Sequence, residues 1–325
     1  MLPVSPYYAE GNRLSVSIEL TNICNFTCPF CPQAYKNKST TPGGSPYNRR
    51  QGMITEEVFH RALSECNRTA ARLELGFFGE QTLHKHYVSF LQELRQRNFS
   101  TELNTNVSFV TEAMMRTWID VGIDLVRLSL DAVHSDVFNR TRPGQVRDLN
   151  GAIVSTDARM QAINEKVHLW LSMPDHAPTR LVFVKSSSNV SEQEAFINYW
   201  QSYLGEDDHI LIKQVLSYGG KINDPLVEPA NRCNVWEMRY LMIDWQGNVS
   251  PCNLDTNMDL TIGNIMQDSI DAIYNGPVAL RLRNQTGCLR DITPCRTCKD
   301  GNNWSRNEVY KRKTTLSEKA GPVSK

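Results

Sequence analysis

Short runs of apolar and polar residues along the first two thirds of the chain switch repeatedly between two periods. Residues 14–20 alternate apolar and polar side chains, which predicts a strand, whereas residues 53–66 repeat apolar side chains at helical spacing. The same signals recur downstream, with strands predicted over 73–78, 101–103, 125–130, 180–184 and 210–216 and helices over 87–97, 111–121 and 191–204. Such alternation of strand and helix indicates a parallel sheet with right-handed crossovers.

The number of these units predicts an open fold. About six are present, fewer than the eight of a closed barrel, so we expect an α/β protein built as a partial (β/α)6 barrel. Beyond residue 230 the pattern changes, because residues 239–244 and 249–251 flank a Trp-Gln-Gly-Asn turn and a helix follows near 269–274. We therefore expect a core domain over 1–228 and a small β-hairpin-plus-helix domain over 229–325. The polar stretch 36–52 is expected to be a long mobile loop.

Charge and composition narrow the class of partner. Lys plus Arg and Asp plus Glu both number 35, so the formal net charge is zero, which argues against a nucleic-acid partner held by its phosphates. We see no secretory signal and no apolar run of roughly 20 residues, so we expect a cytoplasmic chain without a membrane span. In that compartment the nine cysteines are more readily metal ligands or redox groups than disulfides.

The first cysteine group, Cys24, Cys28 and Cys31, has C-x3-C-x2-C spacing in a loop after the first predicted strand. Three thiolates on one short loop can hold three corners of a 4Fe–4S cluster and leave the fourth iron open. A structural zinc site would need a fourth ligand to close its tetrahedron, and this loop supplies none. The spacing therefore favours a cluster with an open iron over zinc or free thiols.

This cysteine motif resembles the signature of the radical SAM superfamily, in which an aromatic residue precedes the third cysteine. Phe30 occupies that position. Phe78-Gly79-Glu80 stands where the family has Gly-Gly-Glu-Pro, although Phe78 replaces the first glycine and Gln81 replaces the proline. The resemblance implies that Glu80 binds the ammonium group of the methionine part of S-adenosylmethionine (SAM).

Two further strand ends carry the same resemblance. Asn104-Thr105-Asn106 is similar to the family's Thr-Asn-Gly strand end, and Ser129-Leu130-Asp131 is similar to its Ser-Leu-Asp-Gly. The resemblance implies that SAM contacts Phe30, Glu80, Asn106, Ser129 and Arg142. It also implies that SAM chelates the open iron and that one electron, from a donor such as flavodoxin or ferredoxin, cleaves it into methionine and a 5′-deoxyadenosyl radical. That radical abstracts hydrogen from a carbon of the substrate.

The second cysteine group comprises Cys233, Cys252, Cys295 and Cys298, spaced C-x18-C-x42-C-x2-C. Four thiolates can fully ligate a 4Fe–4S cluster or a zinc ion, and spacing alone leaves both open. The segment 243–252, followed by 262–265 and the final CxxC, resembles the shortened SPASM, or twitch, domain appended to some radical SAM enzymes. The resemblance implies one auxiliary 4Fe–4S cluster that transfers electrons.

Two cysteines remain outside these groups. Cys66 lies in a helical apolar pattern, which is typical of a buried core cysteine. Cys288 lies seven residues before Cys295 and is assigned as a catalytic hydrogen-atom donor, because an S–H bond is weaker than an ordinary C–H bond. A cluster ligand and an inert thiol are the alternatives for Cys288.

The surplus thiol of Cys288 favours epimerisation over the alternative reactions. The enzyme would then invert a stereocentre of a small polar substrate, such as a sugar or aminocyclitol of an aminoglycoside antibiotic, and would resemble the aminoglycoside-pathway radical SAM epimerases. The alternatives are a dehydrogenase of the 2-deoxy-scyllo-inosamine type, with the auxiliary cluster as electron acceptor, a peptide-modifying enzyme, and a non-catalytic iron–sulfur or zinc binding module. Candidate pocket residues are Glu19, Asn22, Asn106, Lys213 and Tyr218.

Overall fold

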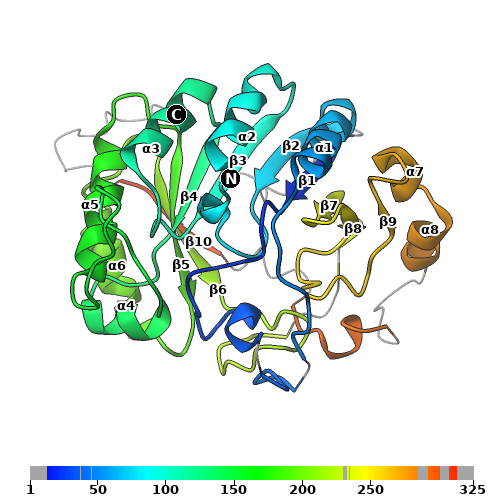
Figure 1. Ribbon diagram of the computed structural model, residues 1–325. Coiled ribbons are helices and arrows are strands. Elements are labelled where there is room, and N and C mark those ends of the chain that lie inside the picture. The colour runs from blue at the N-terminus through cyan, green and yellow to red at the C-terminus, as the bar shows by residue number, and fades with distance from the viewer. Residues whose placement is uncertain are drawn as a thin grey trace, which may run out of the picture.

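The computed structural model describes residues 13–36, 38–44, 46–229, 233, 235–284, 292–300 and 307–312. Within this part, ten strands form an open sheet of order β10-β6-β5-β4-β3-β2-β1-β7-β8-β9 (Figure 1). Six successive strands are parallel neighbours in chain order, namely β1 (Leu14–Ile18), β2 (Ala70–Leu75), β3 (Ser100–Thr105), β4 (Leu125–Ser129), β5 (Thr179–Lys185) and β6 (His209–Gln214). The predicted partial (β/α)6 barrel is confirmed.

Helices connect these strands and lie along the outside of the curved sheet (Figure 1). They are α1 (Glu56–Thr69), α2 (Tyr87–Glu93), α3 (Glu112–Val121), α4 (Ser135–Thr141), α5 (Arg159–Ser172) and α6 (Gln193–Trp200), with 3-10 turns η1 (Pro32–Tyr35), η2 (Gln81–Leu83), η3 (Leu94–Gln96) and η4 (Val190–Glu192). The pattern predicted α1, α2, α3 and α6 but not α4 and α5. Helix α5 buries Arg159 and Lys166 among its apolar residues, which interrupts the apolar period.

Local sequence sets where the helices begin and end. The hydroxyl of Thr55 accepts a hydrogen bond from the Val58 N–H at the start of α1, and Thr111 caps α3 in the same way through Met114. Each cap satisfies an N–H that the first helical turn leaves unpaired. Helix α3 ends at Gly122, whose φ of 68° is a left-handed conformation that glycine adopts without strain.

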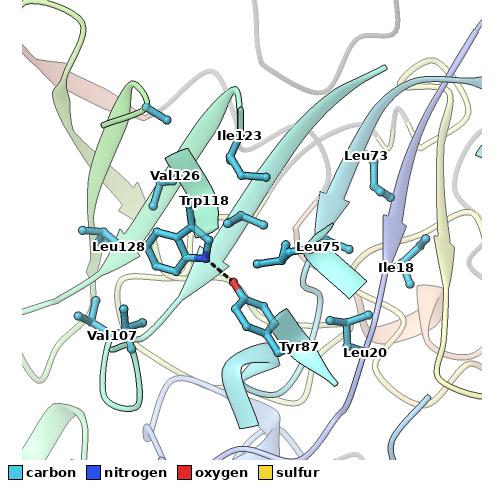
Figure 2. Packing of buried hydrophobic residues seen from close by; sticks show 14 of the residues in the cluster. Ile18, Leu20, Leu73, Leu75, Tyr87, Val107, Trp118, Ile123, Val126 and Leu128 are labelled. Atoms are coloured by element: carbon cyan, nitrogen blue, oxygen red, sulfur yellow. Dashed lines mark hydrogen bonds between the residues drawn. The ribbon is translucent and has the colours of Figure 1, made fainter. Parts of the chain in front are cut away.

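The core lies between the sheet and these helices (Figure 2). Leu75 from β2 and Leu128 from β4 lie beside Trp118 and Tyr87, which come from α3 and α2. The Trp118 indole N–H donates to the Tyr87 hydroxyl over 3.0 Å, so two large aromatic side chains are buried without leaving an unpaired donor.

The C-terminal part extends the same sheet. Strand β7 (Tyr240–Ile243) pairs in parallel with β1, β8 (Asn248–Ser250) and β9 (Gly263–Asn264) follow antiparallel, and α7 (Ile270–Tyr274) and α8 (Pro277–Asn284) come next. The predicted hairpin is therefore confirmed, and Asp244 closes its turn by accepting the N–H groups of Gln246 and Asn248. The domain boundary near residue 228 stays a prediction, because the sheet continues across it.

One strand returns to the core from beyond this part. Strand β10 (Glu308–Tyr310) pairs antiparallel with β6 and covers the edge of the sheet opposite to β9. The hydropathy pattern did not predict it, because a three-residue strand shows no period. In the described part of the chain, no helix has both the length and the apolar character that crossing a membrane would require.

The segment before α1 is packed rather than loose. Tyr47 is 2% exposed, and the Arg49 guanidinium pairs with the carboxylate of Glu19 at the end of β1 and lies 3.4 Å from Asp244 Oδ2. Tyr47 and Arg49 thus anchor residues 46–52 to the barrel, and the mobility of the stretch 36–52 stays a prediction. A guanidinium is removed from water only where carboxylates compensate it, and the sequence pattern did not reveal those partners.

Candidate active site

The loop that carries Cys24, Cys28 and Cys31 follows β1 directly and lies against residues 143–145. The Thr27 N–H donates to the Pro143 carbonyl over 2.9 Å, and the Asn25 side chain donates to the Gln145 carbonyl. A Cβ at Gly144 would stand 2.1 Å from the Asn25 carbonyl oxygen, so the close approach of the two segments requires glycine there. These contacts hold the three cysteines at one end of the barrel.

The environment of the three thiols suits metal ligation. Burial raises the pKa of Cys24, Cys28 and Cys31 to about 12, so the thiols ionise only when a cation compensates their charge. Donors already point at the sulfur of Cys24, since the Phe26 N–H lies at 3.4 Å and the Asn106 amide at 3.8 Å. This donor set fits an iron–sulfur cluster.

A cavity of about 260 Å³ opens beside the cysteine loop, at the carboxyl ends of the parallel strands. The three cysteines line it, and so do all five residues predicted to contact SAM, namely Phe30, Glu80, Asn106, Ser129 and Arg142. The carboxyl edge is where open α/β sheets bind their ligands. Residues from four separate segments of the chain thus meet in one place.

Glu80 lies at the wall of this cavity with its carboxylate already oriented. Its Oε1 accepts from the hydroxyls of Thr82 and Thr105, each over 2.7 Å, and its Oε2 accepts from the Asn106 N–H over 2.7 Å. Burial raises the pKa of Glu80, and these hydrogen bonds oppose the rise. With one donor on Oε2 among the described residues, a lone pair remains for a bound ammonium group.

Gln81, which replaces the family's proline, cross-links two loops. Its Oε1 accepts from the Leu20 N–H over 2.7 Å, and its Nε2 donates to the carbonyls of Phe78 and Thr21. Beside it, a Cβ at Gly79 would lie 2.2 Å from the Thr21 carbonyl oxygen, and the φ of Gly79 is 86°. The departure from the family motif thus keeps the glycine and exchanges a rigid ring for a hydrogen-bonding amide.

Arg142 faces the cavity from the other side. Its guanidinium pairs with Asp131, whose Oδ1 also accepts the Val184 N–H over 2.6 Å, and it stands 5.9 Å from the Phe30 ring. The Nε of Arg142 and both amide atoms of Gln33 are buried without a partner in the part of the chain that the structure describes. The two orphaned donors among these atoms, Arg142 Nε and Gln33 Nε2, belong to residues that line the cavity and fit a ligand such as the SAM carboxylate.

Part of the cavity lining is polar. Glu74, Asn104, Lys213 and Gln214 contribute to it, and burial lowers the pKa of Lys213 to about 8. Of the predicted pocket residues, Asn106, Lys213 and Tyr218 line the cavity. Glu19 and Asn22 are engaged elsewhere, with Arg49 and with the backbone of residues 50 and 52. Sequence reasoning missed Gln33, Glu74 and Gln214, although Glu74 and Gln214 sit at ends of strands.

The second cysteine group assembles at an adjacent wall. Cys233 and Cys298 lie close enough to Cys252 to raise its pKa electrostatically, although burial is the larger cause. Cys295 begins η5 (Cys295–Thr297), and the Cys298 N–H donates to its carbonyl over 3.2 Å. Asn253 and Leu254, the residues after Cys252, line the cavity.

The predictions for the two remaining cysteines, Cys66 and Cys288, have different outcomes. Cys66 is fully buried in α1, which confirms it as a core residue. Cys288 lies outside the described residues, so its assignment as a hydrogen-atom donor stays a prediction.

Models of known protein families match the two segments that carry the cysteine groups. A model of the radical SAM superfamily matches residues 18–165, and a model of the SPASM iron–sulfur cluster-binding domain matches residues 233–299. A tungsten-containing aldehyde ferredoxin oxidoreductase cofactor-modifying protein of Pyrococcus furiosus is 23% identical over 118 residues, which cover 36% of this chain and 30% of that protein. The chain thus matches under a third of that relative's length.

Similar solved structures share the fold. BtrN in complex with AdoMet and 2-DOIA has a TM-score of 0.55 at 17% identity, covering 90% of this chain and 93% of that one. SuiB of Streptococcus suis bound to the precursor peptide SuiA has a TM-score of 0.62 at 12% identity, covering 90% and 72%. Native anSMEcpe with bound AdoMet has a TM-score of 0.59 at 14% identity, covering 90% and 94%.

Both cofactor sites thus have a counterpart in the matched domains. The radical SAM domain carries a 4Fe–4S cluster and SAM, and the SPASM domain carries an auxiliary iron–sulfur cluster. The chain carries a radical SAM domain over residues 18–165, followed by a SPASM-type iron–sulfur cluster-binding domain over residues 233–299.

Proposed function

We propose that the enzyme abstracts hydrogen from a carbon of a small polar molecule, such as a sugar or an aminocyclitol, held by the polar residues of the cavity lining. The observation that carries this proposal is the polar part of the lining, because Glu74, Asn104 and Lys213 line the same cavity of about 260 Å³ as the three cysteines. Hydroxyl and amino groups would find both donors and acceptors there.

The chain's own residues would hold SAM in a fixed orientation. Bound together, the first cluster and SAM supply a 5′-deoxyadenosyl radical. The unpaired Nε of Arg142 is available to the methionine carboxylate, and the lone pair of Glu80 Oε2 is available to the ammonium group. Both side chains are held by protein partners, so binding needs little further ordering.

For the fate of the substrate radical, the described part of the cavity favours oxidation. Because burial lowers the pKa of Lys213 to about 8, roughly a tenth of its amine is neutral at pH 7, and this neutral form can take the proton of a substrate hydroxyl. Asn253, the residue after Cys252, lines the cavity, which supports an auxiliary site close to the substrate. A secondary alcohol would become a ketone by losing its carbon-bound hydrogen to the radical, its hydroxyl proton to Lys213 and one electron. An auxiliary cluster held by Cys233, Cys252, Cys295 and Cys298 would supply the acceptor for that electron.

Epimerisation is the competing outcome, and the surplus thiol of Cys288 supports it. The thiol would return a hydrogen atom to the opposite face of the carbon. The resulting sulfur radical would then need one proton and one electron from an external donor such as reduced flavodoxin or ferredoxin. Seven of the nine cysteines are assigned to clusters and Cys66 is buried in the core, so Cys288 remains for this role.

One experiment separates the two outcomes. Wild type, Cys288→Ala and Lys213→Met are reconstituted with iron and sulfide and incubated in heavy water with SAM, reductant and a panel of aminocyclitols and sugars. Oxidation predicts a product two mass units lighter than the substrate, formed by Cys288→Ala but strongly reduced in Lys213→Met. Deuterium incorporated at one inverted carbon, and lost in Cys288→Ala, would establish epimerisation instead. Failure to release 5′-deoxyadenosine would contradict both.

A further inference from the structure

Asp300 lies two residues beyond Cys298 and is completely buried. Its carboxylate oxygens accept hydrogen bonds from a loop of the core barrel. Oδ1 accepts the Ser217 N–H over 2.5 Å, and Oδ2 accepts the Ser217 hydroxyl over 2.8 Å and the Gly219 N–H over 3.1 Å. Three donors from residues 217–219 thus converge on one side chain of the auxiliary-cluster segment.

Other contacts interlock the same two segments. The Thr297 hydroxyl donates to the Gly219 carbonyl over 2.7 Å, and the Lys299 N–H donates to the Ser217 hydroxyl over 3.2 Å. A Cβ at Gly220 would stand 2.6 Å from Cβ of Thr297, so the two backbones approach too closely for any other residue at position 220. Residues 217–220 and 297–300 therefore form one packed unit.

The packed unit of residues 217–220 and 297–300 contacts the cysteine pair on one side and the cavity on the other. On one side, the backbone N–H of Asp300 lies 3.5 Å from the sulfur of Cys298, and its Oδ2 lies 3.6 Å from that sulfur. On the other side, Tyr218 adopts a left-handed φ of 49° and lines the cavity, with its ring 5.8 Å from that of Phe78. A non-glycine residue holds such a conformation only where its surroundings impose it.

We propose that Asp300 is a positioning residue that ties the Tyr218 wall of the cavity to the Cys295–Cys298 pair, so that occupancy of the auxiliary cluster sets the geometry of the cavity. The backbone N–H of Asp300 faces the sulfur of a cluster ligand, and its carboxylate holds the loop that carries the wall, so loss of the cluster would loosen both. Because such coupling is reciprocal, filling the cavity also stabilises the auxiliary site. The proposal goes beyond the reaction proposed above and holds for either product.

The chemistry of the contact explains why a carboxylate is needed. Its two oxygens accept from three donors, whereas an asparagine offers one acceptor oxygen and presents an N–H group to donors on the other side. Asp300→Asn keeps the volume and removes the acceptor, which makes it the sharpest substitution. Asp208→Asn is the matched control, because Asp208 is equally buried and accepts the Thr179 and Gly205 N–H groups at a distance from both clusters.

The test measures amide hydrogen exchange of the peptide spanning residues 215–222. A full-length chain with Cys24, Cys28 and Cys31 replaced by Ala binds iron only at the auxiliary site, and it is compared after reconstitution with iron and sulfide and in the metal-free form. We expect the metal-free form to exchange at least about tenfold faster at residues 217–220, the loss that breaking charge-assisted hydrogen bonds produces. Asp300→Asn should exchange rapidly in both forms, and Asp208→Asn should behave as its parent does.

The midpoint potential of the auxiliary cluster gives a second readout that a purely structural role would not move. Removing a negative charge beside Cys298 should shift the potential in the positive direction in Asp300→Asn and leave it unchanged in Asp208→Asn. If Asp300→Asn binds no iron, Ser217→Ala carries the test, because it removes the hydroxyl contacts and retains the carboxylate; we expect faster exchange at 217–220 with an unchanged potential. Equal exchange in the loaded and metal-free parent, or unaltered exchange in the substituted chain, would overturn the proposal.

Discussion

Single residues hold the site by hydrogen-bonding backbone groups of distant loops. Gln81 is the clearest case, because its amide satisfies Leu20, Thr21 and Phe78 where the family places a proline. A proline ring at this position would stiffen the turn, yet it would leave those buried backbone groups unpaired. The residue therefore stabilises the end of β1, from which the cysteine loop departs.

We predict that Gln81→Ala lowers the free energy of unfolding by about 2–4 kcal/mol, since it unpairs several buried backbone groups. Gln81→Pro, which restores the family's residue, should be at least as destabilising. Denaturant unfolding of the three chains measures this, with Gln161→Ala on the exposed face of α5 as the control. Gln81→Pro matching the wild type would show that the amide contacts contribute nothing.

The chemistry of Lys213 yields a pH prediction. Burial depresses its pKa to about 8, so the neutral amine forms as pH rises through that value. If Lys213 is the proton acceptor, product formed per 5′-deoxyadenosine released should rise with pH through about 8 in the wild type and should be low and flat in Lys213→Met. A wild-type ratio that falls across this range would rule out the amine as the base.

At the scale of elements, residues 46–52 connect the barrel to the hairpin. Arg49 lies between Glu19 at the end of β1 and Asp244 in the turn between β7 and β8. The parallel pairing of β7 with β1 already joins these elements through backbone hydrogen bonds. The buried guanidinium of Arg49 adds ion pairs between the same two elements. The end of β1, from which the cysteine loop departs, is therefore held to the β7–β8 turn of the auxiliary domain.

We predict that Arg49→Ala destabilises the fold by about 3–5 kcal/mol, because it leaves Glu19 and Asp244 buried without their cation. Arg116→Ala breaks the exposed pair with Glu112 and should cost less than about 0.5 kcal/mol. Thermal and denaturant unfolding compare the two variants. Similar costs for both would show that the buried cluster is no stronger than a surface ion pair.

At the scale of the molecule, one continuous sheet carries both cofactor sites, with the radical SAM strands at its centre and the auxiliary hairpin at one edge (Figure 1). The chain then returns to add β10 at the other edge, beside β6. Because the cavity lies at the ends of the central strands and is closed by residues that follow Cys252, neither part forms the complete cavity alone.

We predict that the two cysteine groups load independently. Fully reconstituted wild type should hold about eight irons, as two 4Fe–4S clusters. Cys295→Ala/Cys298→Ala should hold about four and still release 5′-deoxyadenosine, without forming product. Replacing Cys24, Cys28 and Cys31 by Ala should also leave about four irons but abolish that release. Iron analysis and chromatography measure both quantities. Release of 5′-deoxyadenosine by the triple variant would show that the radical does not form at the first cysteine group.

The sequence by itself determined the parallel (β/α) order and both cysteine groups, because strand period, helix period and ligand spacing are recorded within short stretches of chain. The tertiary structure alone decided which partners Gln81, Arg49 and Asp300 bind. It also decided that β10 pairs with β6 at the edge of the sheet. A carboxylate or an amide has the same local pattern whether water or a buried backbone group is its partner. Only the placement of strand ends, set by packing of residues far apart in the chain, selects that partner.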